Sequence, residues 1–240
     1  MSVARYIIRL LTFRLSHEQL LQLNSKHLIV GLLGTWLVGM GRYWDDPGAH
    51  ILQHLGLGSV IYIFGMSLFI WIVIKPYFVD NWSYITVLTF VSLTSFPAAF
   101  YAIPVERFFA MKIAAEINVW FLAIVAAWRL ALLFYFLIRF TRLGFGYILV
   151  GTLLPVCIII VALSMLNLER AVFDIMGGIR DSTSNDRAYG VLILLTAVSM
   201  MAALPLLVGY IIAIYNRWNA EKAKRQLQPN REQSDDDKPH

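Results

Sequence analysis

One arginine lies near the middle of a long apolar run. Arg129 is the only charged residue between Ile117 and Ile138. A charge at the centre of a membrane helix costs about 2.5–3.5 kcal/mol on insertion scales, so such a residue usually faces a bundle interior or a water-filled cavity. The role of Arg129 is therefore either to hold helices together or to bind an anionic or polar solute. The remaining explanation is that the span ends closer to Arg129, so that the charge lies near the membrane surface and not at its centre.

A second apolar run contains a proline and several hydroxyl groups. Pro97 has no amide hydrogen, so a carbonyl one turn earlier in a helix would lose its donor. We expect Arg129 to contact this broken region, because no Asp or Glu lies at matching depth and Glu116 is about 20 Å away along the helix. The predicted polar site comprises Arg129, Ser92, Thr94, Ser95 and Pro97.

Charged residues follow this run and form a predicted outer-face cluster. Pro104 ends the apolar run, and Glu106, Arg107 and Glu116 come after it. Glu106 and Glu116 are candidate paired carboxylates for an enzyme acting at the membrane surface. The alternative is a solvated surface helix whose ion pairs contribute only tenths of a kcal/mol each.

Metal and cofactor chemistry find little support in the sequence. His50 and His54 have the i, i+4 spacing of zinc ligands, with Asp45 and Asp46 nearby, but no glutamate lies between the two histidines. The single cysteine, Cys157, excludes an intrachain disulfide. We find no nucleophile elbow and no phosphate-binding glycine loop. We therefore expect no metal and no cofactor, and the sequence favours a non-enzymatic protein.

Composition indicates how these residues are positioned. Of the 240 residues, 59% are hydrophobic and only 15% are charged, whereas soluble proteins are about 25% charged. Runs of about 20 apolar residues are long enough to cross a bilayer. The sequence predicts an all-α membrane domain over 27–216, a bundle of six transmembrane helices at about 27–41, 55–74, 83–103, 117–138, 145–166 and 188–215.

The first predicted span is short. At about 15 residues it either crosses with help from neighbouring polar side chains or forms a re-entrant pair with the next loop. It carries Gly31, Thr35 and Gly39 at four-residue spacing, a pattern that lets helix backbones approach closely. These residues predict tight helix packing, within the bundle or between copies of the chain.

The two ends of the chain differ from the spans. In residues 1–26, basic and apolar side chains fall on opposite faces of a helix. This pattern predicts a cytoplasmic amphipathic interfacial helix that packs on the bundle or lies flat on the leaflet. Residues 217–240 begin as a basic helical continuation and end in a composition typical of a disordered tail. Between the last two spans, residues 169–178 predict a short interfacial helix.

Charge distribution predicts orientation. If six helices cross, 13 Lys/Arg lie on the side of the termini and six lie on the other side, and Arg129 belongs to neither. Because basic residues accumulate in cytoplasmic loops, both termini are expected in the cytoplasm, and the net charge of +5 needs no nucleic acid. Short loops and the lack of an organelle signal suit a bacterial inner membrane.

Three functions remain open. The leading hypothesis is a membrane subunit or scaffold that binds other membrane proteins or itself. The second is a small transporter or channel for an anionic or polar solute, with Arg129 and kinks at Pro97, Pro155 and Pro205 lining the path. The third is an intramembrane lipid-modifying enzyme that uses Glu106, Arg107 and Glu116.

Overall fold

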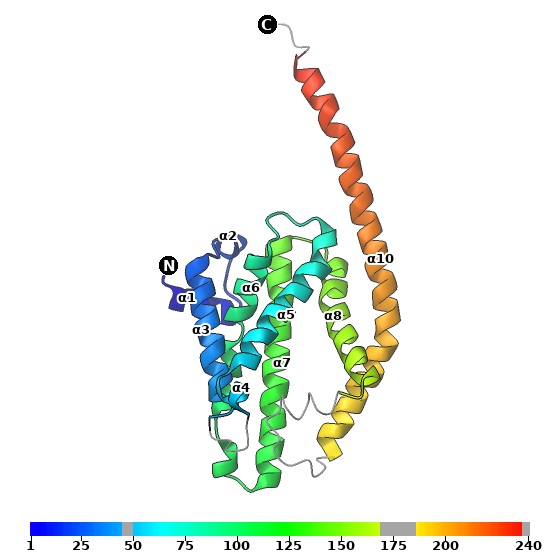
Figure 1. Cartoon of the computed structure of the whole chain (residues 1–240). Coiled ribbons are helices and arrows are strands. Elements are labelled where there is room, and N and C mark those ends of the chain that lie inside the picture. The colour runs from blue at the N-terminus through cyan, green and yellow to red at the C-terminus, as the bar shows by residue number, and fades with distance from the viewer. Residues whose placement is uncertain (45–49, 169–185, 237–240) are drawn as a thin grey trace.

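The computed structural model describes residues 1–44, 50–168 and 186–236, and within these ranges the chain is helical, with no strand. Figure 1 shows the elements in order. They are α1 (Val3–Leu11), α2 (His17–Leu21), α3 (Ser25–Gly41), α4 (Ile51–His54), α5 (Leu57–Ile74), η1 (Lys75–Tyr77), α6 (Tyr84–Leu93), η2 (Phe96–Ala102), η3 (Val105–Arg107), α7 (Met111–Thr141), α8 (Phe145–Met165) and α10 (Asp186–Asp236).

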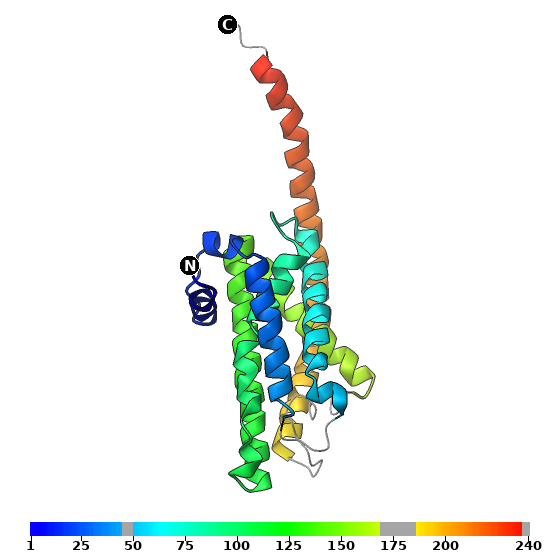
Figure 2. The same cartoon turned by 60° about the vertical axis from the view of Figure 1, so that its left-hand side comes forward.

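The long helices alternate in direction. In Figures 1 and 2, α3, α6 and α8 run away from the end that carries both chain termini, and α5, α7 and α10 return to it. We call this end, with α2 and η1, the terminal end, and the end with Tyr43 and η3 the opposite end. The described residues include five stretches long and apolar enough to cross a membrane, which supports an integral membrane protein: Leu57–Tyr77, Tyr84–Arg107, Glu116–Thr141, Phe145–Met165 and Leu192–Gln226.

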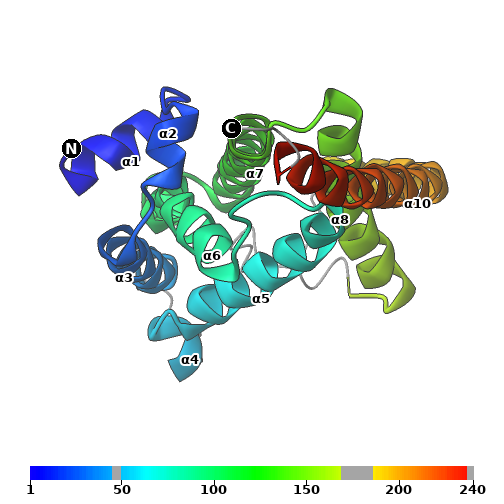
Figure 3. The ribbon, with the colours of Figure 1, turned by 90° about the horizontal axis from the view of Figure 1, so that it is seen from above.

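Helix α6 occupies the centre of the bundle. Figure 3 shows it between α3, α5 and α7. Every residue from Val87 to Leu93 is buried, so α6 contacts protein on all sides. Phe90 stacks on Phe136 of α7, with ring centroids 4.0 Å apart. The third predicted span is thus the element around which α3, α5 and α7 pack.

The α-helix of this third span is shorter than expected. The sequence predicts a helix over 83–103, but α6 ends at Leu93 and the chain continues as the 3₁₀ helix η2. The physical reason is Pro97, which has no N–H and cannot donate to the carbonyl of Leu93. Hydroxyl groups satisfy the backbone next to the break: Thr94 Oγ1 donates to the Val91 carbonyl at 2.8 Å, and Ser95 Oγ donates to the same oxygen at 3.4 Å.

Small residues on α3 allow it to approach α6 closely. A Cβ atom placed on Gly31 would lie 2.2 Å from Ser92 Oγ. Thr35 Oγ1 donates to the Gly31 carbonyl at 2.9 Å and to the Ser92 carbonyl at 3.3 Å. Gly39 faces Ser59 of α5 in the same way. The predicted packing face of α3 is therefore used within one chain.

The N-terminal segment, residues 1–26, packs against the bundle. The ring of Tyr6 lies 4.4 Å from the ring of His27 at the start of α3. Trp128 Nε1 donates to the Leu11 carbonyl at 3.0 Å, and the Tyr135 hydroxyl donates to the Leu15 carbonyl. Burial, with a smaller contribution from Tyr135, raises the pKa of the Tyr6 phenol, so its hydroxyl stays protonated and donates to the Gln19 carbonyl.

Helix α10 extends further than the predicted span. The sequence predicts a disordered tail from 217, whereas the structure continues one helix of 51 residues through Asp236. The residues after Trp218 include good helix formers, and Glu221 and Arg225 form an i, i+4 pair at 3.8 Å. Lys222 lies 5.3 Å from the Trp218 ring centroid. The interfacial helix predicted over 169–178 lies outside the described residues.

We expect Gly31→Ala to destabilise the protein, because the new methyl group would overlap the Ser92 side chain. Overpacking of this kind costs about 1–3 kcal/mol. The matched control is Gly65→Ala on α5, where nothing lies within 4 Å of the added atom and alanine favours the helix. Unfolding of the purified protein in detergent, followed by circular dichroism, measures both changes. Equal stability of the two variants would contradict the close α3–α6 contact.

We expect Trp128→Phe to loosen the N-terminal segment, because the bond to the Leu11 carbonyl is lost while the aromatic packing is kept. A hydrogen bond contributes a net free energy of about 0.5–1.5 kcal/mol, so its loss should make tryptic cleavage at Arg14 about two- to tenfold faster. Trp120→Phe on the same helix is the control, because the Trp120 side chain is 68% exposed. Unchanged cleavage in Trp128→Phe would argue against this attachment.

Candidate functional site

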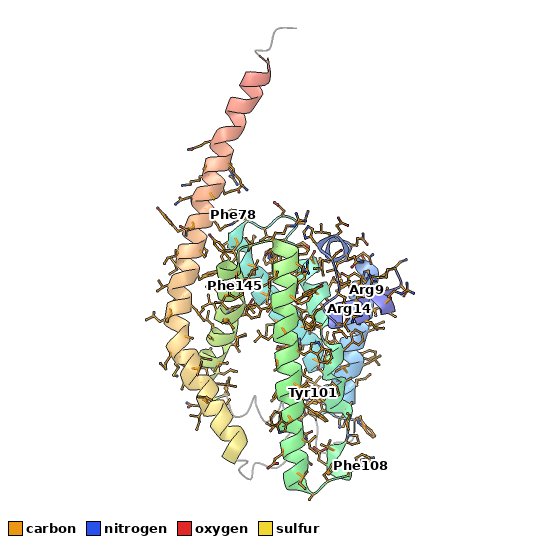
Figure 4. All side chains as sticks on the ribbon, turned by 180° about the vertical axis from the view of Figure 1, so that it is seen from behind. Arg9, Arg14, Phe78, Tyr101, Phe108 and Phe145 are labelled. Carbon is orange, nitrogen blue, oxygen red and sulfur yellow. The ribbon has the colours of Figure 1, made fainter. Side chains whose placement is uncertain are left out.

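The central arginine of α7 lies against aromatic rings. The Cζ atom of Arg129 is 5.5 Å from the centroid of the Tyr62 ring on α5. Tyr101 of η2 lies within electrostatic range of both Arg129 and Arg42, and Arg42 Cζ is 5.0 Å from its ring centroid. In Figure 4, Tyr101 lies beside α7, on the side of the bundle nearer to Phe108 than to Phe78. Two guanidinium groups from different helices thus approach one phenol.

The direction of α7 explains how Arg129 reaches this region. Long side chains on a helix lean toward the N-terminus of that helix. Because α7 starts at the opposite end, the Arg129 side chain extends from mid-helix toward the opposite end, where η2 and the first turns of α5 lie. Arg129 is half-buried and Tyr62 is 40% exposed. The contact therefore sits at the margin of the bundle and not in its closed centre.

The structure divides the predicted polar site into two groups. Ser92, Thr94, Ser95 and Pro97 are buried around the α3–α6 contact, where the three hydroxyl groups donate to carbonyls of their own helix. Arg129 donates no hydrogen bond to any of them within the described residues. The backbone groups next to the break already have hydroxyl donors, and Arg129 instead lies at the Tyr101 end of η2.

Two further arginines at the opposite end also lie over aromatic rings. Arg107 Cζ is 4.8 Å from the Trp44 ring, and Trp44 Nε1 donates to the Ala102 carbonyl at 3.0 Å. Arg42 also lies 5.5 Å from the ring centroid of Tyr43. Arginine favours such contacts because its planar cation stacks on the negative face of a ring. We call the following residues the arginine–aromatic cluster: Arg42, Arg107, Arg129, Trp44, Tyr62 and Tyr101.

The predicted outer-face carboxylates have separate surroundings. Glu106 Oε1 accepts a hydrogen bond from Asn118 Nδ2 at 2.8 Å, which ties η3 to α7. Glu116 is part of α7 itself, because that helix begins at Met111, six residues before the predicted start. Arg107 faces Trp44. Across residues 1–44, 50–168 and 186–236, no group of three or more His, Cys, Asp or Glu could hold a metal ion.

The sequence reasoning missed the aromatic partners of the arginines. Trp44 reads as an interfacial aromatic, and Tyr62 and Tyr101 read as ordinary span residues. Arg42 was counted only as a loop charge. One sequence signal indicates such contacts. Arg42 directly precedes Tyr43, and Arg107 follows Tyr101 by six residues, both where a predicted span ends. The pairing of Tyr62 with Arg129 depends on the helix arrangement and has no local signature.

Comparison of the chain with protein-family models, with curated proteins and with solved structures gave no match.

We expect water to accompany the Arg129 guanidinium, because it pairs with no carboxylate in the described part of the chain. In a Cys157→Ser background, cysteine at Ala126, one turn before Arg129 on its face, should react with a charged thiol reagent. Cysteine at Ile124, which is 49% exposed on a different face, should not react, because it contacts lipid. The readout is the mass of the labelled protein in membranes. Protection at both positions would show that no water reaches Arg129.

Proposed function

We propose that the chain is a non-enzymatic membrane subunit that binds another membrane protein, or a second copy of itself, through α10. The observation that carries this proposal is the extent of α10. Its 51 residues run along α8 and then past the terminal end of the bundle (Figure 1). A helix that leaves its own bundle offers a partner one continuous surface, in the bilayer and beyond it.

The attachment of α10 is confined to part of its surface. Tyr210 donates to the Val73 carbonyl at 2.7 Å, and Arg217 Nε donates to the Tyr77 carbonyl at 2.8 Å. Both contacts join α10 to α5 and η1 near the terminal end. On the other side of α10, large apolar side chains are exposed, among them Met201 at 80% and Leu204 at 68%. This side faces lipid or a partner.

The proposal includes six spans with both termini in the cytoplasm of a bacterial inner membrane. Helix α3 has 17 residues, or about 25 Å, slightly less than the roughly 30 Å hydrocarbon layer. Its direction fits a crossing, because it runs from the terminal end toward the opposite end beside α6. The 13 to six distribution of Lys/Arg favours the terminal end as cytoplasmic.

The contacts of the polar residues favour a subunit over a transporter that uses the third span. The hydroxyl groups of Ser92, Thr94 and Ser95 donate to carbonyls of their own segment. The Thr35 hydroxyl donates to the Ser92 carbonyl. A solute path along α6 would require these hydroxyls to point into an opening, and instead they are buried. The engagement of Glu106 by Asn118 likewise weighs against a catalytic carboxylate pair.

A photo-reactive amino acid at Met201 should crosslink α10 to its partner in living cells. Ser199 on the same helix is the control, because it is 4% exposed and faces the bundle. A covalent product at twice the monomer mass identifies a second copy, and any other mass identifies a different protein by peptide sequencing. Ending the chain after Arg225 should weaken the product if the extension contributes. No product above the Ser199 level, with no effect of the shortened chain, would refute the proposal.

A further inference from the structure

The arginine–aromatic cluster contains hydrogen-bond donors that the protein does not use. Arg129 carries five N–H donors, and Tyr62 and Tyr101 each carry a hydroxyl. In the described part of the chain, none of these three side chains hydrogen-bonds to a protein acceptor. The donors come from α7, α5 and η2, three elements that are far apart in sequence. Their convergence indicates an acceptor outside the described part of the chain.

The Tyr62 ring offsets only part of the cost of the Arg129 charge. A cation over an aromatic face gains about 0.5–2 kcal/mol, and this attraction acts on the charge without accepting the N–H groups. Placing the charge at mid-helix costs about 2.5–3.5 kcal/mol. Because Arg129 is half-buried, the protein covers only part of the guanidinium. An anionic oxygen ligand would satisfy both the charge and the directional donors.

Charge at the opposite end favours an anion. Arg42 lies over the same Tyr101 ring, and Arg107 lies over Trp44 close to the Ala102 carbonyl. Glu106, a described carboxylate at this end, accepts from Asn118. Guanidinium groups gathered from three elements produce a positive potential that attracts oxyanions, whatever other contacts Arg42 and Arg107 make.

The exposure of the donors indicates how a ligand reaches them. Tyr62 is 40% exposed on α5, while Arg129 and Tyr101 are half-buried behind it. The first turns of α5 lie at the opposite end of the bundle, and the adjacent side chains Ile61 and Phe64 are exposed apolar groups that would contact lipid. The site therefore opens sideways, on the side of the bundle where these apolar side chains are exposed.

We propose that Arg129, Tyr62 and Tyr101 bind the oxygens of a phosphate group, presented by a phospholipid headgroup or as a free oxyanion. Arginine binds phosphate through two parallel N–H···O bonds, and the two phenols add single donors on either side of the guanidinium. This site lies on α5, η2 and α7 and is independent of the partner binding proposed for α10.

The test is native mass spectrometry of the full-length protein in detergent with added phosphatidylglycerol. Arg129→Gln should lower the bound lipid about tenfold or more, because bonds to a charged acceptor contribute about 1.5–3 kcal/mol. Arg14→Gln is the control, since Arg14 is an exposed arginine at the terminal end (Figure 4). Equal lipid loss in both variants, or no loss in Arg129→Gln, would overturn the proposal.

A second variant separates binding from folding. Tyr62→Phe combined with Tyr101→Phe keeps both rings and removes only the two hydroxyl groups, so it should fold and still bind less lipid. Inorganic phosphate distinguishes the two sources. If it stabilises the wild-type protein to heat without lipid, and Arg129→Gln abolishes this effect, the ligand is a free oxyanion. If only the lipid binds and its binding depends on Arg129, the ligand is a headgroup. Unaltered lipid and phosphate binding in the double variant would refute the assigned donors.

Discussion

The arrangement of this bundle depends on supplying donors to backbone carbonyls where α6 ends among apolar helices. Each unsatisfied carbonyl in such surroundings costs several kcal/mol, because no bulk water is present. Thr94 and Ser95 serve the Val91 carbonyl from within the same segment, and Thr35 of α3 reaches the Ser92 carbonyl. The last of these bonds requires α3 to lie very close to α6. The glycine at position 31 makes that approach sterically possible.

The central position of α6 divides the bundle into a core and a peripheral pair. α3, α5 and α7 surround α6, and aromatic stacking of Phe90 on Phe136 closes one side. Helices α8 and α10 pack mainly on each other and join the core through α7, η1 and α5, and Gly151 allows Ile74 of α5 to approach α8. A partner bound on α10 would therefore contact the peripheral pair and leave the interior hydrogen bonds of α6 unchanged.

The sequence predicted the elements whose signal is continuous hydrophobicity. Helix α8 begins at the predicted Phe145 and ends at Met165, one residue before the predicted boundary, because the apolar run is unbroken by charge and its internal Pro155 does not end the helix. The third span shows the opposite case. Pro97 predicts a break in the helix. That the chain continues as a 3₁₀ helix, and that hydroxyl groups donate to the carbonyls next to the break, depends on how α3 packs. The helical continuation after Trp218 was missed, because low hydrophobicity predicted disorder where helix-forming residues follow an existing helix.

The candidate site was only half predictable for the same reason. A charge in an apolar run marks Arg129 from sequence alone, since the cost of burying it is local. Its neighbours are set by the crossing of α5, η2 and α7, which no pattern in any one of these segments records. The sequence placed Ser92, Thr94 and Ser95 at about the same depth in the membrane as Arg129. In the structure their hydroxyl groups do not point toward Arg129, because these residues contact α3 and their own helix.

Basic residues lie over aromatic rings toward both ends of the bundle, lysines (Lys75 and Lys222) toward the terminal end and arginines toward the opposite end. At the terminal end, Arg217 also donates to the Tyr77 carbonyl. In the proposed orientation the opposite end lies outside the cytoplasm, where basic residues are less common, so contacts that stabilise each arginine there are expected. Arg42, Arg107 and Arg129 all lie over aromatic rings there. The Tyr62 ring stabilises the Arg129 cation but cannot accept its in-plane N–H groups, which is why the proposed oxyanion site is placed at Arg129.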